Sequence, residues 1–200
     1  MRNMTAPPRR TQAERRSRTS TALLTAARRL FTEKGFAETA VSEVAAAAGV
    51  SNGALYHLFP DKRALMAALF EQMQQEVLAR VAAATVAIAD PFERLRAGCQ
   101  AFLDAALDPS IQRIAVIESR AVLGEEAWNA IEARYGLGAL QAGLAAIPGV
   151  EPAIAAAAGQ MLLGALGEAT LFIARSPDQA AARRIAGLAL DRTLEGFRPR

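Results

Sequence analysis

Residues 35–65 read GFAETAVSEVAAAAGVSNGALYHLFPDKRAL, and this stretch decides the fold. Two short helical patterns lie on either side of a sharp break at residues 49–51, Gly-Val-Ser. Positions i, i+3, i+4 and i+7 of the first pattern form one apolar helical face, made of Val41, Val44, Ala45 and Ala48. Two short helices that meet at such a break are typical of a helix-turn-helix, which presents its second helix to the major groove of DNA.

Small polar residues mark where these helices begin and end. We expect Thr39 to cap the first helix, because its hydroxyl can accept a hydrogen bond from a free backbone N–H. Gly49 stands where the first helix ends, a position that favours a left-handed residue, and Ser51 can cap the next helix. The second helix then turns an apolar side inward, formed by Leu55, Leu58 and Phe59.

The outward side of the second helix, about Asn52–Phe59, is predicted to read DNA. Small residues there allow close approach to base edges, and longer side chains can reach bases or phosphates. Asp61 can cap a further helix, which would place the Lys62 charge at a positive helix terminus and make it a phosphate contact. The residues predicted to contact DNA are Thr39, Ser42, Ser51, Asn52, Gly53, Ala54, Tyr56, His57 and Lys62.

An upstream helix completes a small three-helix domain over residues 19–63. One face of it is apolar, and the helix is predicted to end near Lys34-Gly35. Residues 1–18 are rich in arginine and are predicted to form a mostly disordered basic arm. This arm either adds attraction to phosphates or is simply a solvated tail.

Charge is divided unevenly along the 200 residues. Residues 1–63 carry 11 Lys/Arg and 5 Asp/Glu, whereas residues 64–200 carry 12 and 15. A basic N-terminal third beside a mildly acidic remainder suits a nucleic-acid reader attached to a body that does not touch DNA. Basic termini are common, so the charge alone does not establish DNA binding.

Residues 19–65 resemble the DNA-binding domain of the TetR (tetracycline repressor-like) family of bacterial transcription regulators. The matching pattern consists of Gly35-Phe36, Thr39-x-Val41, Val44-Ala45, Ala48-Gly49-Val50-Ser51, Gly53-x-Leu55-Tyr56, Phe59, Lys62 and Leu65. Ala40 and Leu58 depart from it, since the family often has a hydroxyl residue at the first position and His or Tyr at the second. The resemblance implies a homodimer, an all-helical ligand-binding body and a palindromic operator.

The remaining sequence, residues 64–200, divides at Pro and Gly signals into further helices. Residues 62–84 form a long helix, and the pairs Asp90-Pro91 and Asp108-Pro109 open two more. Residues 124–147 form another, with possible breaks at two glycines. We predict an all-α fold of about nine helices, with the C-terminal part as a ligand-binding and dimerisation domain.

Residues 153–174 are apolar enough to raise the question of a membrane span. A polar Gln160 and a charged Glu168 argue instead for a helix buried on most sides. Two adjacent apolar C-terminal helices in each chain can pair as a four-helix interface between two copies. The predicted interface residues are Met161, Leu162, Leu166, Leu190, Leu194 and Phe197.

A ligand pocket is expected among the middle helices, apolar with a few polar groups. The candidate residues are Phe70, Met73, Val77, Phe102, Ile114, Glu118, Trp128, Ile131 and Tyr135. Glu118 shares a face with apolar residues, so it could bind a cationic ligand or a hydroxyl. The alternative is that Glu118 is partly exposed, or paired with Arg113, Arg120 or Arg134. The aromatic and methionine positions are better explained as plain core.

An enzyme is the main rival class, and the sequence disfavours it. His57 is the only imidazole, Cys99 fits a core position, and no nucleophile elbow, Walker loop or metal-ligand cluster is visible. We therefore expect no cofactor, no metal and no membrane association, and an Arg-rich N-terminus without an apolar run indicates a cytoplasmic protein. The predicted partners are operator DNA, a second copy of the chain and a small, largely apolar effector. The predicted function is that of a ligand-released repressor, and the alternative is a constitutive or architectural DNA-binding protein.

Overall fold

The computed structural model describes residues 11–199, and within them every regular element is helical. The α-helices are α1 (Gln12–Lys34), α2 (Val41–Ala47), α3 (Asn52–Leu58), α4 (Lys62–Thr85), α5 (Pro91–Ala105), α6 (Ser119–Arg134), α7 (Gly136–Ala145), α8 (Pro152–Arg175) and α9 (Gln179–Leu194). A π-helical segment, η1 (Ile111–Glu118), precedes α6, and a short 3-10 turn, η2 (Glu195–Phe197), follows α9. The prediction of an all-α fold is confirmed.

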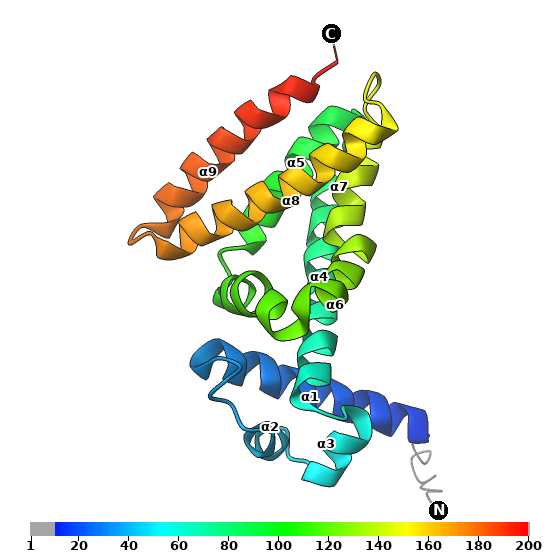
Figure 1. The fold of residues 1–200 in the computed structure, drawn as a ribbon, viewed down its shortest axis with the longest axis vertical. Helices are drawn as coiled ribbons and strands as arrows, with labels where there is room; N and C mark the ends of the chain where they lie inside the picture. The colour runs from blue at the N-terminus through cyan, green and yellow to red at the C-terminus, as the bar shows by residue number, and fades with distance from the viewer. Residues whose placement is uncertain (1–10, 200) are drawn as a thin grey trace, which may run out of the picture.

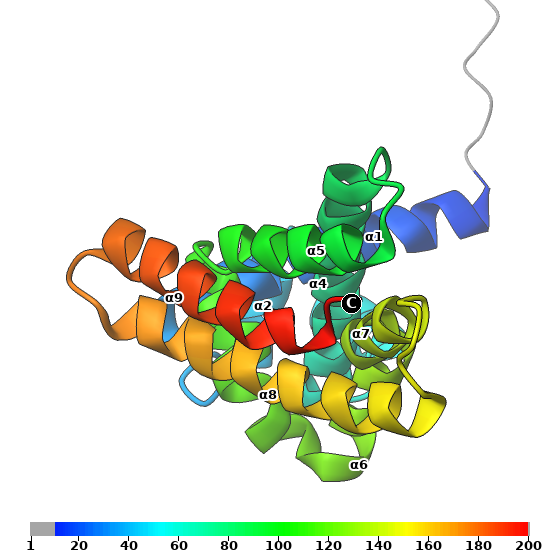
Figure 2. The same ribbon diagram turned by 90° about the horizontal axis from the view of Figure 1, so that it is seen from above.

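Helices α1, α2 and α3 lie together at one end of the molecule, and α4 runs from them into the larger helical body (Figure 1). Seen from above, α5 and α9 lie side by side, with α8 beneath α9 (Figure 2). We call α1–α3 the reader and the helices from α5 onward, with the C-terminal part of α4, the body.

The disordered arm was predicted over residues 1–18. Of these, residues 1–10 lie outside the described residues. Residues 12–18 are the first turns of α1, so for them the prediction is wrong. The reason is a reciprocal cap at Thr11. The Thr11 hydroxyl accepts from the Glu14 N–H at 3.3 Å, and the Glu14 carboxylate accepts from the Thr11 N–H at 3.0 Å.

Helix boundaries in the reader follow the cap residues that the sequence offers. The Ser51 hydroxyl accepts from the Ala54 N–H at 3.2 Å, and the Asp61 carboxylate accepts from the Ala64 N–H at 2.6 Å. Gly49 has a φ of 68°, the left-handed conformation expected where α2 ends. Two of the three predicted caps, at Ser51 and Asp61, and the predicted turn at Gly49 are therefore confirmed.

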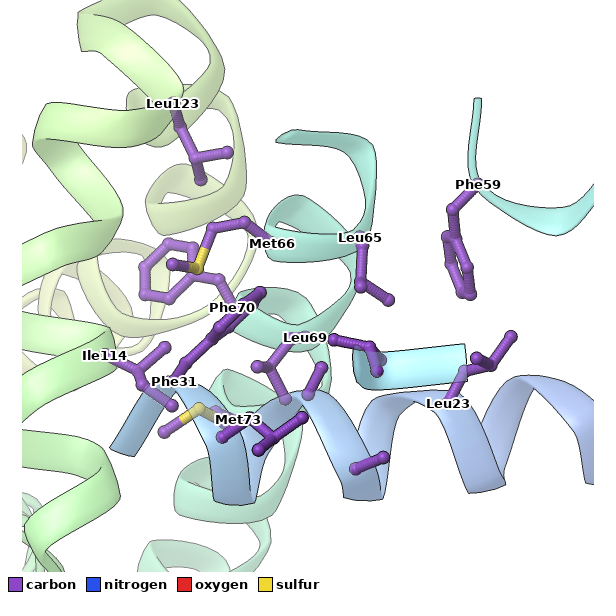
Figure 3. Close-up of a cluster of buried hydrophobic side chains, with 14 of the residues drawn as sticks. Leu23, Phe31, Phe59, Leu65, Met66, Leu69, Phe70, Met73, Ile114 and Leu123 are labelled. Carbon is purple, nitrogen blue, oxygen red and sulfur yellow. The ribbon is translucent and has the colours of Figure 1, made fainter. Parts of the chain in front are cut away.

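One hydrophobic core continues from the reader into the body (Figure 3). Phe31 of α1 is fully buried together with Leu69 and Met73 of α4 and Ile114 of η1. Since these side chains come from both parts of the molecule, a displacement of η1 or α4 in the body changes the packing under α1.

A second core lies among α5, α7, α8 and α9, and it corrects the predicted dimer interface. The structure buries four of the predicted interface residues inside their own chain, with exposed fractions of 5% or less: Leu162, Leu166, Leu190 and Leu194. Phe197 is half-buried against the same core, whereas Met161 is 75% exposed. The buried leucines turn inward because α8 and α9 first have to cover α5 and α7.

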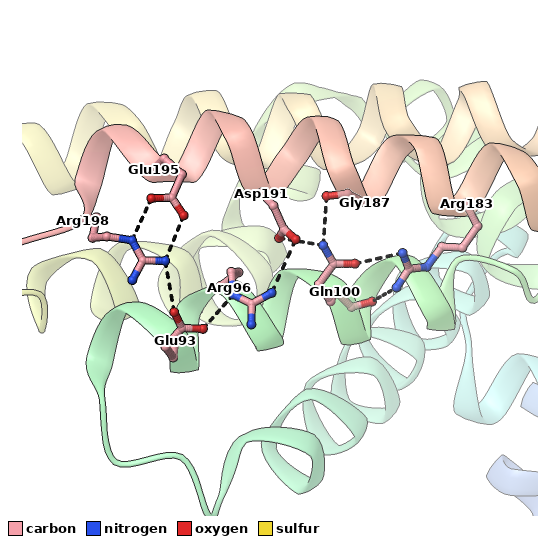
Figure 4. A network of polar contacts seen from close by, with 8 residues as sticks. All are labelled: Glu93, Arg96, Gln100, Arg183, Gly187, Asp191, Glu195 and Arg198. Atoms are coloured by element: carbon pink, nitrogen blue, oxygen red, sulfur yellow. Dashed lines mark hydrogen bonds and ion pairs between the residues drawn. The ribbon is translucent and has the colours of Figure 1, made fainter.

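Polar contacts fix α9 on α5 (Figure 4). The Gln100 amide donates to the Gly187 carbonyl at 3.0 Å and to the Asp191 carboxylate at 2.8 Å. Arg183 donates to the side-chain and backbone oxygens of Gln100, both at 2.9 Å. This network sets which side of α9 faces outward.

Helix α8 is long and apolar enough to cross a membrane by those two criteria alone, and 33% of its most apolar window is buried. The core helix of a soluble protein meets the same two criteria, so length and hydropathy alone do not make α8 a membrane span.

Candidate nucleic-acid interface and ligand cavity

Helix α3 has the two-sided character that the sequence predicts. Leu55 and Phe59 are buried against the reader core, and Leu58 is partly buried. The opposite side and the N-terminus of α3 are open, with exposed side chains at Ser51, Asn52, Tyr56 and His57, an exposed Gly53 and a half-buried Ala54. Ser42 on α2 is exposed as well. This outer side of α3 is exposed, carries polar side chains and has small residues at its start, as a helix entering the major groove requires.

Thr39 does not belong to this surface, and its predicted roles as a cap and as a DNA contact are wrong. The side chain is fully buried, and its hydroxyl donates to the Gly35 carbonyl at 2.8 Å. The N-cap of α2 is Ala40, whose N–H is bonded by the Glu43 carboxylate at 2.9 Å. A threonine hydroxyl can donate as well as accept. Here it donates to a carbonyl at the end of α1, where the last carbonyls of a helix have no partner within the helix.

Lys62 lies at the start of α4 as expected, but its ammonium is already bonded within the protein. It donates to the carbonyls of Phe36 at 2.7 Å, Thr39 at 3.0 Å and Ala37 at 3.3 Å, and it lies 4.3 Å from the Phe36 ring centroid. An ammonium has three N–H donors, so no donor is left for a phosphate. The prediction of a phosphate contact is replaced by a structural role, in which Lys62 holds the α1–α2 turn against α4.

Replacing Lys62 with methionine is therefore expected to lower the free energy of unfolding by about 1.5–3 kcal/mol, the range for hydrogen bonds to a charged group. Urea unfolding of the purified protein measures this change. The control is Lys34→Met, which removes an exposed ion pair with Glu43 and should cost under about 1 kcal/mol. Unchanged stability combined with a lower salt dependence of DNA binding would restore the phosphate role.

A cavity of about 580 Å³ lies in the body among α4, α5, η1, α6, α7 and α8. Of the residues predicted to line a pocket, four do so: Met73, Val77, Phe102 and Trp128. Four others do not: Phe70, Ile114 and Ile131 point into the core shared with the reader, and the Tyr135 hydroxyl donates to Glu71 at 2.9 Å. Helical spacing identified the right helices, but it could not tell the cavity side of a buried helix from the side that faces another helix.

Glu118 is the remaining candidate; it does not line the cavity, and the alternative that it pairs with Arg113 is confirmed. One of its carboxylate oxygens accepts from the backbone N–H of Phe36 at 2.9 Å, and the other accepts from Arg113 at 3.2 Å. Arg113 also donates to the carbonyls of Thr32 at 3.1 Å and Glu33 at 3.3 Å. Glu118 and Arg113 thus hold η1 to the end of α1.

The polar groups that do line the cavity include Gln74 and Glu132, which the sequence analysis did not single out. Glu132 is 5% exposed, and one of its oxygens accepts from the Gln74 amide. Burial raises the pKa of the Glu132 carboxyl to about 7, and the hydrogen bond from Gln74 together with the nearby backbone of Leu137 offsets only part of that rise. The sequence held one sign that Glu132 lines the cavity: it follows the pocket candidate Trp128 by four residues, which places both on the same side of one helix.

The π-helical segment η1 lies between the cavity and the reader. Ile111, Ala115 and Val116 line the cavity, whereas Arg113 and Glu118 bond to α1 and the following turn. The Ser119 N–H reaches back to the Ile114 carbonyl, the wider hydrogen-bonding pattern of a π-helix, which is rare and often found at functional sites.

Two family models together match most of the chain. The model described as "Bacterial regulatory proteins, tetR family" matches residues 23–69, which contain most of the reader. The model described as "Tetracyclin repressor-like, C-terminal domain" matches residues 92–197.

Individual proteins agree with these models. A crystal structure of a TetR-family transcriptional regulator from Pectobacterium atrosepticum has a TM-score of 0.74 and 32% identity, over 96% of this chain and 99% of that chain. The HTH-type transcriptional regulator CymR of Pseudomonas putida is 44% identical over 75 residues, 38% of this chain and 37% of CymR. The match thus spans little more than a third of CymR. FadR of Bacillus subtilis in complex with stearoyl-CoA has a TM-score of 0.63 over 85% of this chain and 96% of that chain, and at 20% identity it shows the fold alone.

The reader, the helical body and these likenesses define a helix-turn-helix DNA-binding transcription regulator. The chain belongs to the TetR family of such regulators. It is a member of a family of transcription factors rather than of enzymes.

Proposed function

We propose that the protein is a homodimeric repressor that binds a palindromic operator and releases it when a small, largely apolar compound enters the cavity. The observation that carries this proposal is the position of η1, which forms part of the cavity wall and is bonded to the end of α1. A ligand that favours one arrangement of η1 is expected to favour one position of the reader, because both are packed in one core.

The DNA contacts are assigned to the outer side of α3 and to Ser42 of α2. The exposed groups that support this assignment are Ser42, Ser51, Asn52, Gly53, Ala54, Tyr56 and His57. In a dimer the two α3 helices would read half-sites about 34–36 Å apart, or slightly more, which is one turn of DNA.

Selection of bound sequences from a random DNA pool tests this function. The expected result is a palindrome with two half-sites, bound strongly in preference to unrelated DNA. Retention of DNA without any consensus sequence would favour the alternative, an architectural DNA-binding protein.

Pairing of two copies is assigned to α8 and α9. Each helix has a stripe of exposed apolar side chains at helical spacing, with Ile154, Met161 and Phe172 on α8 and Ile185 and Leu188 on α9. These five side chains are 50–75% exposed, although α8 and α9 are otherwise well packed. An exposed apolar surface of this kind marks an interaction site, and the proposed occupant is the same surface of a second copy.

Wild-type protein is expected to sediment as a dimer at micromolar concentration, and Leu188→Arg is expected to sediment as a folded monomer. Leu188 is 66% exposed, so arginine fits in the monomer but would bury an unpaired charge in the dimer. Val86→Arg, at an 85% exposed position outside α8 and α9, is the matched control and should remain dimeric. A monomeric wild type would contradict both the pairing and the palindromic operator.

A further inference from the structure

We propose that the cavity binds an apolar compound carrying a protonated amine, with the Glu132 carboxylate as its counter-ion. The inference rests on the proposed function, since it names the chemical class of the effector. It starts from a carboxylate that the surrounding protein leaves incompletely paired.

Glu132 is 95% buried, and only one of its two carboxylate oxygens has a hydrogen-bond partner, the Gln74 amide. The other oxygen, Oε2, has no partner and is enclosed beside Gly136, at the first turn of α7. Among residues 11–199, no Lys or Arg nitrogen lies within 4.0 Å of this carboxylate. Ionising a buried carboxylate without a cation is costly, so a cation that reaches it stabilises the charged form.

The arginines of the cavity wall are engaged elsewhere. Arg94 donates to the carbonyls of Ile88 at 2.8 Å and Ala89 at 3.0 Å, and Arg120 pairs with Glu125 in solvent. Two residues after Glu132 in α6, Arg134 pairs with Glu71 of α4 at 3.1 Å. Within the part of the chain that the structure describes, the cavity wall therefore supplies no free cation for Glu132, and the missing partner is assigned to the ligand.

The other residues of the cavity wall indicate what the remainder of the ligand is like. Most of it is apolar, including Met73, Val77, Phe102, Trp128 and Leu166. A volume of about 580 Å³ is within the range of pockets for small organic molecules. The terminal torsion of a glutamate is soft, so the carboxylate can turn an oxygen toward the ligand from its place in the wall. A compound with an apolar body and one amine head matches this arrangement.

Two compounds of nearly equal size and shape, 6-phenylhexylamine and 6-phenylhexan-1-ol, test the inference on the full-length protein. The dissociation constant of each is measured by titration calorimetry at neutral pH, for the wild type and for Glu132→Gln. We expect the wild type to bind the amine at least about tenfold more tightly than the alcohol, and the variant to lose this preference. Glu126→Gln, with the same charge change at an exposed position of the same helix, should keep it.

Equal affinities of the two compounds for the wild type, or no measurable binding of the amine, would overturn the inference, and neither result depends on how a variant folds. A preference for the amine that survives in Glu132→Gln would also overturn it, because another group would then be the counter-ion. Operator affinity is measured separately with and without the amine. If the amine binds through Glu132 but leaves operator affinity unchanged, the inference stands and the ligand-released repressor of the proposed function fails.

Discussion

Replacing Glu132 with glutamine is expected to stabilise the protein at about pH 8 by up to about 3 kcal/mol. Burial raises the pKa of this carboxyl from 4.5 to about 7, so the folded state holds the proton more tightly than the unfolded state does. The stability that comes from the bound proton is complete below about pH 4.5 and is lost as the pH rises through about 7. Glutamine does not ionise and keeps the hydrogen-bonding position of the protonated acid, so the variant does not suffer this loss.

The measurement is the free energy of unfolding of wild type and variant between about pH 4.5 and 8. The difference between them should grow with pH, mostly between about pH 5 and 7.5. Glu126→Gln on the exposed side of α6 provides the baseline and should show a small, nearly constant difference. A difference for Glu132→Gln that does not vary with pH would show that the carboxyl titrates normally, and that its side chain reaches water.

Replacing Gly53 with glutamate is expected to weaken operator binding by at least about a hundredfold, because a like charge would face the DNA in both copies of the dimer. Gly53 lies at the exposed start of α3, and a side chain added there meets only the Ser51 hydroxyl at 3.9 Å. The fold should therefore accept the substitution, and glutamate has the higher helix propensity.

Gly196→Glu adds the same charge in η2, next to the C-terminus, which lies at the opposite end of the molecule from the reader (Figure 1). Nothing lies within 4 Å of the added carbon. The variant should leave operator affinity nearly unchanged. This control distinguishes a charge placed against the DNA groove from a general effect of the protein's net charge. Fluorescence anisotropy with labelled operator measures both variants. Normal operator binding by Gly53→Glu would remove α3 from the DNA interface.

The reader could be predicted from the sequence because its boundaries are local. Ser51, Asp61 and Gly49 each act on the backbone within a few residues, so the residue type is enough to place a cap or a turn. Lys62 was assigned the wrong role for the opposite reason, because its ammonium bonds to carbonyls of the α1–α2 turn 23 to 26 residues away, and that turn exists only after the helices have packed. The Thr39 hydroxyl bonds to the Gly35 carbonyl only four residues back, and the residue type alone could not show whether it would donate to the end of α1 or cap α2.

The cavity and the pairing surface depend on which side of an apolar helix faces which neighbour. Helix α8 is apolar on several sides, so periodicity could not show that Leu162 and Leu166 face inward while Met161 faces solvent. Glu118 and Glu132 are both glutamates on helices that border the cavity, yet one bonds to the reader and the other lines the cavity. From the sequence, Glu118 was placed in the pocket and Glu132 was given no role, because only the packed structure shows what each one faces.

In the proposed mechanism, binding of a compound in the cavity and binding of DNA by the reader affect each other's free energy through η1. The most direct test is the affinity for the selected operator with and without a saturating compound that raises the melting temperature of the protein. The proposal predicts a decrease of about 5–150-fold, with an equal decrease in the affinity for the compound when operator is bound. Glu118→Gln, which weakens the tie between η1 and the Phe36 N–H, should reduce that factor while leaving the cavity intact. A compound that binds tightly in the cavity yet leaves operator affinity unchanged would contradict the linkage and favour a constitutive regulator.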